Sequence, residues 1–341
     1  METTDPLPLP YYVVGLTYNL KKGIKSDVED IEAEYDNIDT VHAIKEALEQ
    51  LNCKVELLEA DVGIFKDLLE KKIDIVFNIA EGIYGRGREA QIPAILNFLK
   101  IPFTGSDETS LCISLDKALS KRILSTYGIR TPGYQLVFNI NTGIDSNLRF
   151  PLIVKPNAEG SSKGISDCAV VCSMQELQQQ LEKNFEMYNQ TMLLEEFIYG
   201  REFTVGIVDN GEDTVVFPPM EIIYRNKEQK HNIYSFNVKK NYKEYIEYSC
   251  PALLENGLKS RLIDAAKKIY NILECKDFSR VDFRLSEQGE IHFIEINPLP
   301  GLAPGYSDYP MIAEFKGIGY KSIIKMVLNS ALKRHDMEPI I

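Results

Sequence analysis

Short apolar runs alternate with segments of helical spacing through the first hundred residues. Within 40–51, apolar side chains recur at Val41, Ile44 and Leu48, which predicts an amphipathic helix with Asp39 at its N-cap. The run IDIVFNI is typical of a buried parallel strand. Strands are expected at 11–16, 54–58, 72–78 and 102–103, helices at 40–51 and 90–99, and a polar loop at 21–36. This alternation predicts a doubly wound α/β unit with a parallel sheet.

Beyond residue 107 the pattern predicts two further units, in which strands and helices are mixed in the α+β manner. Helices are expected at 115–127, 175–184, 260–273 and 320–332, and strands at 134–138, 150–155, 166–171, 192–196, 202–208 and 215–223. The polar stretch 225–247 has no strong period, and loops of such length are usually functional or disordered. We interpret it as a lid, with a plain surface insertion as the alternative.

The segment from Phe278 to Gly301 predicts a β-hairpin, with strands 281–285 and 291–296 around a polar turn. Side chains two apart on a strand share a face. One face is therefore expected to carry Arg280, Asp282, Glu295 and Asn297, together with Ile291 and Phe293, while His292 points away. Three oxygen-bearing side chains beside an arginine suit Mg²⁺ next to an anionic substrate. The alternative is a salt bridge on a sheet surface.

A second motif joins an apolar strand that ends at Lys155 to the Gly/Ser-rich loop Asn157–Gly164. Glycines let backbone N–H groups approach a phosphate, and Ser161 and Ser162 add hydroxyl donors. Lys155, and Lys117 on a predicted helix, could each supply a charge for the phosphates. The alternatives are a surface turn and solvated lysines.

Two further segments offer binding groups. Residues 193–203 could hold a planar base at a hinge, with Phe197 and Ile198 as walls and Glu202 accepting from ribose hydroxyls. Ligands of open α/β sheets bind at the carboxyl ends of the strands. The polar residues after the buried strand 72–78 are therefore substrate-site candidates: Glu81, Arg86, Arg88 and Glu89.

The composition limits the classes of molecule that the protein is expected to bind. A net charge of −12 argues against nucleic acid or an anionic membrane as the main partner. The six cysteines form no CxxC pair, so free, reduced thiols are expected. The acidic, Pro-rich start is unlike a signal peptide, and no run of 18 apolar residues exists, so we expect a cytoplasmic protein.

Five motifs occur in one order along the chain: TGS at 104–106, LDKALSK at 115–121, IVKPNAEGSSKG at 153–164, EEFIYGREFTV at 195–205, and RVDF with EINPLPG between 280 and 301. Together they resemble the ATP-grasp superfamily, and within it the D-alanine–D-alanine ligase family, from about residue 75 to 324. The resemblance implies three domains: 1–106, then the ATP-grasp subdomains 107–197 and 198–341, the last with the lid 225–247.

The resemblance also implies roles for individual residues. ATP would be held by Lys117, Lys155, Ser161, Ser162, Glu195, Glu196, Phe197, Ile198 and Glu202. Two Mg²⁺ ions, for which Mn²⁺ can substitute, would be held by Asp282, Glu295 and Asn297. Catalysis would involve Arg280, which neutralises an oxyanion, Lys239 of the lid and Ser161. The substrates would contact Glu81, Arg86, Arg88, Gly301, Tyr306 and Ser307.

Departures from the family pattern lie in the substrate pockets. The family's Gly-Gly-x-Ser-x-Glu run, which supplies a glutamate to the first D-alanine's ammonium, is absent near 14–26. The family's His-Gly-x-x-Gly-Glu-Asp-Gly loop is replaced by AEGIYGRGREA. A serine that binds the second D-alanine is replaced by Tyr306, with Ser307 beside it, and Lys240 stands where a tyrosine usually follows the lid lysine.

These observations predict an ATP-dependent carboxylate–amine ligase that forms an acyl phosphate and releases ADP and phosphate. Its substrates would be amino-acid-like or peptide-like and other than two D-alanines, the first being anchored by a carboxylate or an aromatic group. The alternatives are a D-alanine–D-alanine ligase, a ligase of specialised metabolism that uses a non-amino-acid acid or a carrier thiol, a phosphotransferase, and an ATP-binding regulator. A homodimer and a carrier-protein partner are left open.

Overall fold

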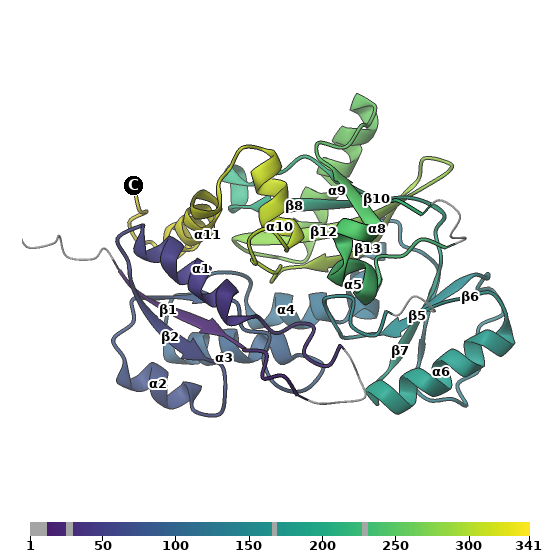
Figure 1. Ribbon diagram of the computed structural model, residues 1–341, viewed down its shortest axis with the longest axis horizontal. Coiled ribbons are helices and arrows are strands. Elements are labelled where there is room, and N and C mark those ends of the chain that lie inside the picture. Colours follow the sequence, from purple (N-terminus) through teal and green to yellow (C-terminus); the bar gives the residue numbers. More distant parts are fainter. Residues whose placement is uncertain (1–11, 25–29, 166–168, 227–230) are drawn as a thin grey trace, which may run out of the picture.

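The structure is a computed structural model that describes residues 12–24, 30–165, 169–226 and 231–341. Three sheets follow one another along the chain: a parallel sheet in the purple and blue part, a four-stranded sheet in teal, and a six-stranded sheet in green and yellow (Figure 1). The mixture of a parallel sheet with helix-covered antiparallel sheets confirms the predicted fold class.

The first sheet has the order β2-β1-β3 and all its strands are parallel. Its strands are β1 (Val13–Tyr18), β2 (Lys54–Glu59) and β3 (Ile75–Asn78). Helix α1 (Ile38–Glu49) packs on one face, whereas α2 (Ile64–Glu70) and α3 (Gln91–Leu99) pack on the other. Helix α2 was not predicted, α1 begins after Asn37 instead of Asp39, and Phe103 forms an isolated bridge with Val76 instead of a strand.

The second sheet is antiparallel, with the order β4-β7-β5-β6. Its strands are β4 (Tyr134–Val137), β5 (Leu152–Pro156), β6 (Val170–Val171) and β7 (Met192–Glu196). Helix α6 (Met174–Tyr188) covers it through Leu177 and Leu181. The predicted strand 166–171 is partly outside the described residues, since 166–168 are not among them.

The third sheet has the order β11-β10-β8-β12-β13, with β9 paired to β8. Its strands are β8 (Gly200–Val208), β9 (Val215–Val216), β10 (Met220–Tyr224), β11 (Ile246–Ser249), β12 (Phe278–Ser286) and β13 (Ile291–Asn297). Helix α9 (Asn256–Ile272) packs Leu262, Ala266 and Ile269 on one face. Helices α10 (Asp308–Phe315) and α11 (Tyr320–Arg334) extend the core shared with α1, so the chain's two ends support each other.

Helices α4 (Glu108–Leu115) and α5 (Lys117–Thr126) connect the first sheet to the second. Two 3₁₀ turns, η1 (Arg88–Ala90) and η2 (Gly211–Asp213), complete the list of elements together with the helices of the 225–247 stretch. That stretch is not a featureless loop, because it contains α7 (Phe236–Lys240) and α8 (Tyr242–Tyr245) and runs into β11. No helix of the described residues is long and apolar enough to cross a membrane.

The hairpin β12–β13 differs from strict alternation at one point. Asp282 pairs with Glu295, but the next pair is Phe283 with Phe293, so one residue of β13 is bulged out. The bulge turns Phe293 into the core, where the prediction had put it on the face of Glu295. It also pairs His292 with Arg284, on the face of Arg280 and Asp282, so the predicted opposite orientation of His292 is wrong.

Candidate functional site

Two cavities adjoin where the three sheets meet. The large cavity has a volume of about 320 Å³ and is lined by the loop before α1, the residues after β3 and the loop 299–308. The small cavity, of about 80 Å³, lies between strands β5 and β7 and strands β12 and β13. Lys239 and Arg280 line both, so the two cavities share a cationic wall. The large cavity is within the size range of small-molecule sites.

Glu195 lies deep in the small cavity between two buried lysines. Its carboxylate is 2.6 Å from Lys121 Nζ and 2.6 Å from Lys155 Nζ, and all three side chains are at most 3% exposed. Burial lowers the pKa of Lys121 to about 8, because it outweighs the attraction of Glu195. Burial would raise the pKa of Glu195, but the two lysines outweigh it and lower the pKa. The Glu195 carboxylate is thus paired with the two lysines, and its place beside adenine stays a prediction.

The residues that follow Glu195 in the sequence differ in whether they line the small cavity. Ile198 and Glu202 line the small cavity as predicted, and Glu196 also lines it although its carboxylate accepts a hydrogen bond from the Arg149 backbone N–H. Phe197 does not line the cavity; it packs with Ala169 and Ile233 behind it. Burial raises the pKa of Glu202, whose carboxylate accepts from the Tyr224 hydroxyl at 2.8 Å.

Strands β12 and β13 bring the three predicted metal ligands together. Arg280 pairs with Asn297 and Asp282 pairs with Glu295 across the hairpin, so the four side chains that the sequence assigned to one face lie opposite one another. Burial would raise the pKa of Glu295, but the positive charges of Lys117, Lys155 and Arg280 lower it to about 2. Lys117 Nζ is 3.2 Å from the Glu295 carboxylate. Two carboxylates and an amide beside the cavities are hard oxygen donors, so these residues fit Mg²⁺.

The loop 157–164 lies between the cavities, and each of its two serines faces a different one. Ser161 lines the large cavity and Ser162 lines the small cavity. Both have positive φ, 50° and 59°, a backbone strain that is stored preferentially at functional sites. The Ser162 hydroxyl donates to the Tyr234 carbonyl at 2.8 Å, which ties the loop to the 225–247 stretch.

Asp308 fixes Arg280 at the shared wall. Its carboxylate is 3.1 Å from Arg280 Nη1 and accepts from the hydroxyls of Tyr234 and Tyr248, at 3.2 and 2.9 Å. Arg280 also donates to Asp282 through Nε and Nη2. Gly301, Tyr306 and Ser307 line the large cavity as predicted. Burial lowers the pKa of Lys239, and the nearby Arg280 charge lowers it further.

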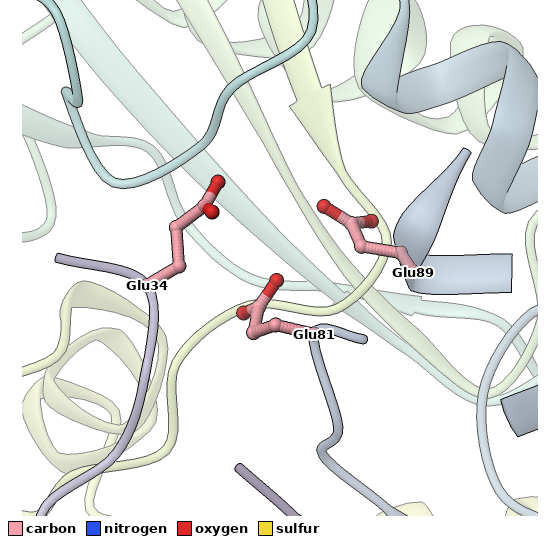
Figure 2. Close-up of side chains that lie close together, drawn as sticks. All are labelled: Glu34, Glu81 and Glu89. Atoms are coloured by element: carbon pink, nitrogen blue, oxygen red, sulfur yellow. The ribbon is translucent and has the colours of Figure 1, made fainter. Parts of the chain in front are cut away.

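The floor of the large cavity carries three carboxylates, which we call the glutamate cluster: Glu34, Glu81 and Glu89. Figure 2 shows them pointing toward one another from the loop before α1, the residues after β3, and η1. One oxygen of each lies within 4.8 Å of the others. Burial raises the pKa of Glu81, with the Glu89 charge as the next cause, and it raises the pKa of Glu89 to about 8.

Neither predicted substrate arginine lines the large cavity. The Arg86 side chain is 72% exposed and is 2.8 Å from the carboxylate of Asp116. Arg88 is buried, and its guanidinium is shared by Glu34, Glu159 and the Ala158 carbonyl. The contact of these arginines with a substrate stays a prediction, and the floor of the large cavity is acidic.

Three contributors escaped the sequence analysis. Lys121 stands one helical turn after Lys117, a spacing that could have indicated it. Asp308 follows Ser307 directly. Glu34 lies in a loop without periodicity, and the sequence analysis gave it no role, although it lines the large cavity.

Comparisons with known proteins agree with this arrangement. Residues 129–329 match the family described as D-ala D-ala ligase C-terminus. A D-alanine–D-alanine ligase of Aquifex aeolicus is 34% identical over 295 residues, which are 86% of this chain and 94% of that protein. An uncharacterized protein, y4sG, of Sinorhizobium fredii is 31% identical over 85% of this chain and 86% of its own length.

A solved structure shares the whole architecture. The D-alanine–D-alanine ligase from Bacillus anthracis, crystallised with ATP, matches with a TM-score of 0.73 and 25% identity, over 95% of this chain and 98% of that one. The resemblance carried by the five sequence motifs is confirmed. The chain belongs to the D-alanine–D-alanine ligase family of ATP-grasp proteins, and it is an ATP-dependent ligase.

Proposed function

We propose that this ligase joins an amino-acid-like or peptide-like carboxylic acid to an amine through an acyl phosphate, and that its substrates are not two D-alanines. The observation that carries the proposal is the shared wall, where Lys239 and Arg280 face both cavities. An acid in the large cavity and a triphosphate in the small cavity would meet there. The cations offset charge that grows on the transferred phosphoryl group.

The reaction has two steps. A carboxylate oxygen of the acid attacks the γ-phosphorus, the bond to the β-phosphate oxygen breaks, and ADP leaves. The amine then attacks the carbonyl carbon, inorganic phosphate leaves, and the amine loses a proton. Lys117 and Lys155 would hold the ATP phosphates, with Lys155 kept in place by Glu195. Arg280, held by Asp308, would stabilise the oxyanion of the tetrahedral intermediate.

Two Mg²⁺ ions would be held by Asp282, Glu295 and Asn297. The pKa of Glu295 is about 2, so its carboxylate is ionised at any working pH. When bound, they would offset the negative charge of the phosphate oxygens. Positioning of the two reacting groups supplies the remaining part of the rate enhancement.

The choice against two D-alanines rests on the floor of the large cavity. Three carboxylates meet there, whereas the family pattern supplies one glutamate to the ammonium of the first D-alanine. A single α-ammonium leaves buried carboxylates without a counter-charge, and an unsatisfied buried charge costs more than the about 1–3 kcal/mol of a neutral polar group. D-alanine is therefore a poor match for this floor.

The direct test follows phosphate release with MgATP. D-Alanine alone, at high concentration, should give little phosphate, whereas a correct acid and amine pair should give stoichiometric ADP and phosphate. Hydroxylamine in place of the amine should trap the acyl phosphate as a hydroxamate, whether the natural acceptor is an amine or a thiol. Efficient D-alanyl-D-alanine formation would overturn the substrate choice alone; a phosphorylated product without free phosphate would overturn the ligation.

A further inference from the structure

The glutamate cluster has more negative charge than its surroundings neutralise. Arg88 pairs with Glu34 and Glu159, and Lys163 adds a second cation to Glu159 at 3.0 Å. Within the described part of the chain, no lysine, arginine or histidine lies within 4.0 Å of the carboxylates of Glu81 or Glu89. Arg88 attracts both carboxylates and Lys117 attracts Glu89, but burial and the neighbouring carboxylates outweigh these cations, and the pKa of each carboxyl is raised.

Glu89 gives the second, independent observation. It is only 5% exposed, it lines the large cavity, and its carboxylate has no hydrogen-bond or ion-pair partner among the described residues. A buried carboxylate without a partner lowers the free energy of unfolding, so Glu89 does not serve to stabilise the fold. Figure 2 shows Glu89 directed toward Glu81 and Glu34 across open space.

The other cationic groups that line the large cavity form no ion pair with Glu81 or Glu89 among the described residues. Lys239 and Arg280 belong to the shared wall, and Arg280 is already paired with Asp282 and Asp308. Lys21 lies near Asp36. Burial raises the pKa of Asp36, and the charge of Lys21 lowers it by a smaller amount. Among the described residues no cation forms an ion pair with Glu81 or Glu89, so a cationic ligand in the cavity would favour their ionised forms.

We propose that the glutamate cluster binds the side-chain cation of the acid substrate, so that this substrate is a basic amino acid with an ammonium or guanidinium group besides its α-amino group. The inference rests on the proposed function, since it assumes that the acid occupies the large cavity. A cation in the cluster favours the ionised forms of these carboxylates, and a basic amino acid brings one there besides its α-ammonium, whereas alanine does not.

The spacing of the oxygens suits an organic cation. An ammonium that donates hydrogen bonds of about 2.8 Å in tetrahedral directions reaches oxygens about 4.6 Å apart. The three carboxylates present oxygens within 4.8 Å of one another. The Arg88 guanidinium bonded to Glu34 repels a cation at the cluster, and it repels a divalent ion more strongly than a single ammonium charge.

The experiment compares lysine with norleucine, which has the same chain length without the terminal ammonium. Calorimetry is done on the full-length enzyme with a non-hydrolysable ATP analogue and Mg²⁺, using both stereoisomers of each amino acid, and ornithine and arginine as further basic acids. At least one basic acid should bind tenfold or more tightly than norleucine of the same configuration. Equal or tighter binding of norleucine overturns the inference.

The variant Glu89→Gln tests the cluster directly. It should reduce the preference for the basic acid over norleucine at least tenfold, whereas Glu46→Gln on the exposed face of α1 should leave the preference intact. ATP-analogue binding, measured on both variants, reports retention of the fold. Glu81→Gln is the second variant, and it should have the same effect. An unchanged preference in both variants overturns the inference, as does tight binding of Mg²⁺ or Ca²⁺ alone that either variant abolishes.

Failure of this inference and failure of the proposed function are distinguishable. If neutral acids support phosphate release or hydroxamate formation as well as basic acids do, only the inference fails. If lysine binds selectively and yet no acid yields hydroxamate with MgATP, the cation site stands and the ligation proposal fails.

Discussion

The two cavities both contain buried carboxylates, but they differ in how the charge is balanced. Around the small cavity, four acidic groups have a cationic partner: Glu195 with Lys121 and Lys155, Glu295 with Lys117, Asp282 with Arg280, and Glu202 with Arg284. Glu196 instead accepts a hydrogen bond from the Arg149 backbone N–H. On the floor of the large cavity, Glu81 and Glu89 have none among the described residues. A balanced network holds its side chains in place before any ligand arrives. An unbalanced one is completed by its ligand.

This difference implies opposite responses to the same kind of mutation. A Glu→Gln change removes one negative charge and nearly preserves shape. Where the carboxylate is paired, the change leaves buried cations uncompensated. Where it is unpaired, the change removes repulsion between like charges. Paired carboxylates should therefore support stability or chemistry, and unpaired ones should oppose stability.

The largest expected effect is on turnover in Glu295→Gln. Loss of this carboxylate removes a metal-binding charge next to the transferred phosphoryl group, so kcat should fall by about 10³-fold or more. Turnover is followed as ADP release at saturating Mg²⁺. The matched control is Glu287→Gln at the exposed turn of the hairpin, which should retain normal turnover. Near-normal turnover of Glu295→Gln would rule out the metal assignment.

The second prediction concerns the paired carboxylate Glu195. Glu195→Gln leaves Lys121 and Lys155 buried without a counter-ion, and breaking such a pair typically costs about 3–5 kcal/mol of unfolding free energy. Urea denaturation measures this loss, with exposed Glu186→Gln on α6 as the control. A loss below about 1 kcal/mol would show that water already solvates these lysines.

The third prediction concerns the unpaired carboxylate Glu81, whose replacement should stabilise the protein. Glu81→Gln should raise the free energy of unfolding by about 0.5–2 kcal/mol, because it removes a carboxyl group whose ionisation is opposed by burial and by the charge of Glu89. The same urea measurement applies, and Glu46→Gln should change the stability little. Destabilisation by Glu81→Gln would mean that Glu81 has a structural partner, and the contrast between the two cavities would collapse.

The last prediction is a pH dependence. The pKa of Glu89 is about 8 in the folded protein, against about 4.3 in an unfolded chain. Between these values the folded state binds more protons, so stability falls as pH rises from about 5 to 8, by at most about 1.4 kcal/mol per pH unit for one proton. Asp36, with a pKa of about 7, contributes in the same direction.

Urea denaturation between pH 5 and 8.5 tests this dependence in the wild type and in Glu89→Gln. The variant should show a flatter profile, because one of the groups with a raised pKa is removed. Identical slopes in the two proteins would assign the pH dependence to Asp36 or to other groups.

The sequence predicted the chemistry of the hairpin better than its geometry. Strand alternation placed Arg280 with Asp282 on one face of the first strand, and Glu295 with Asn297 on one face of the second. Counted from the turn without a bulge, Asp282 would face Ile294, so its pairing with Glu295 comes from the bulge. The bulge after this pair was not predictable from a period of two, because one extra residue inverts every face beyond it. Phe293 and His292 were therefore assigned to the wrong faces.

Short elements and long-range partners were the other misses. Helices α2, α4 and α10 have seven or eight residues, too few for a helical period to stand out. Glu81 was predicted because it follows a buried parallel strand, where ligands bind. Glu34 could not be, because only the packing of the loop before α1 against Arg88 and Gly160 places its carboxylate on the cavity floor.

The shared wall formed by Lys239 and Arg280 separates a region whose side chains can be exchanged from a region whose side chains are held in a sheet. Arg280 comes from a central strand, with Asp282, Glu295 and Asn297 beside it, whereas the glutamate cluster comes from loops and a 3₁₀ turn. Side chains on such loops can be exchanged without disturbing a sheet. New acid specificities could therefore evolve, or be engineered, on the cavity floor while the phosphoryl-transfer apparatus is inherited unchanged.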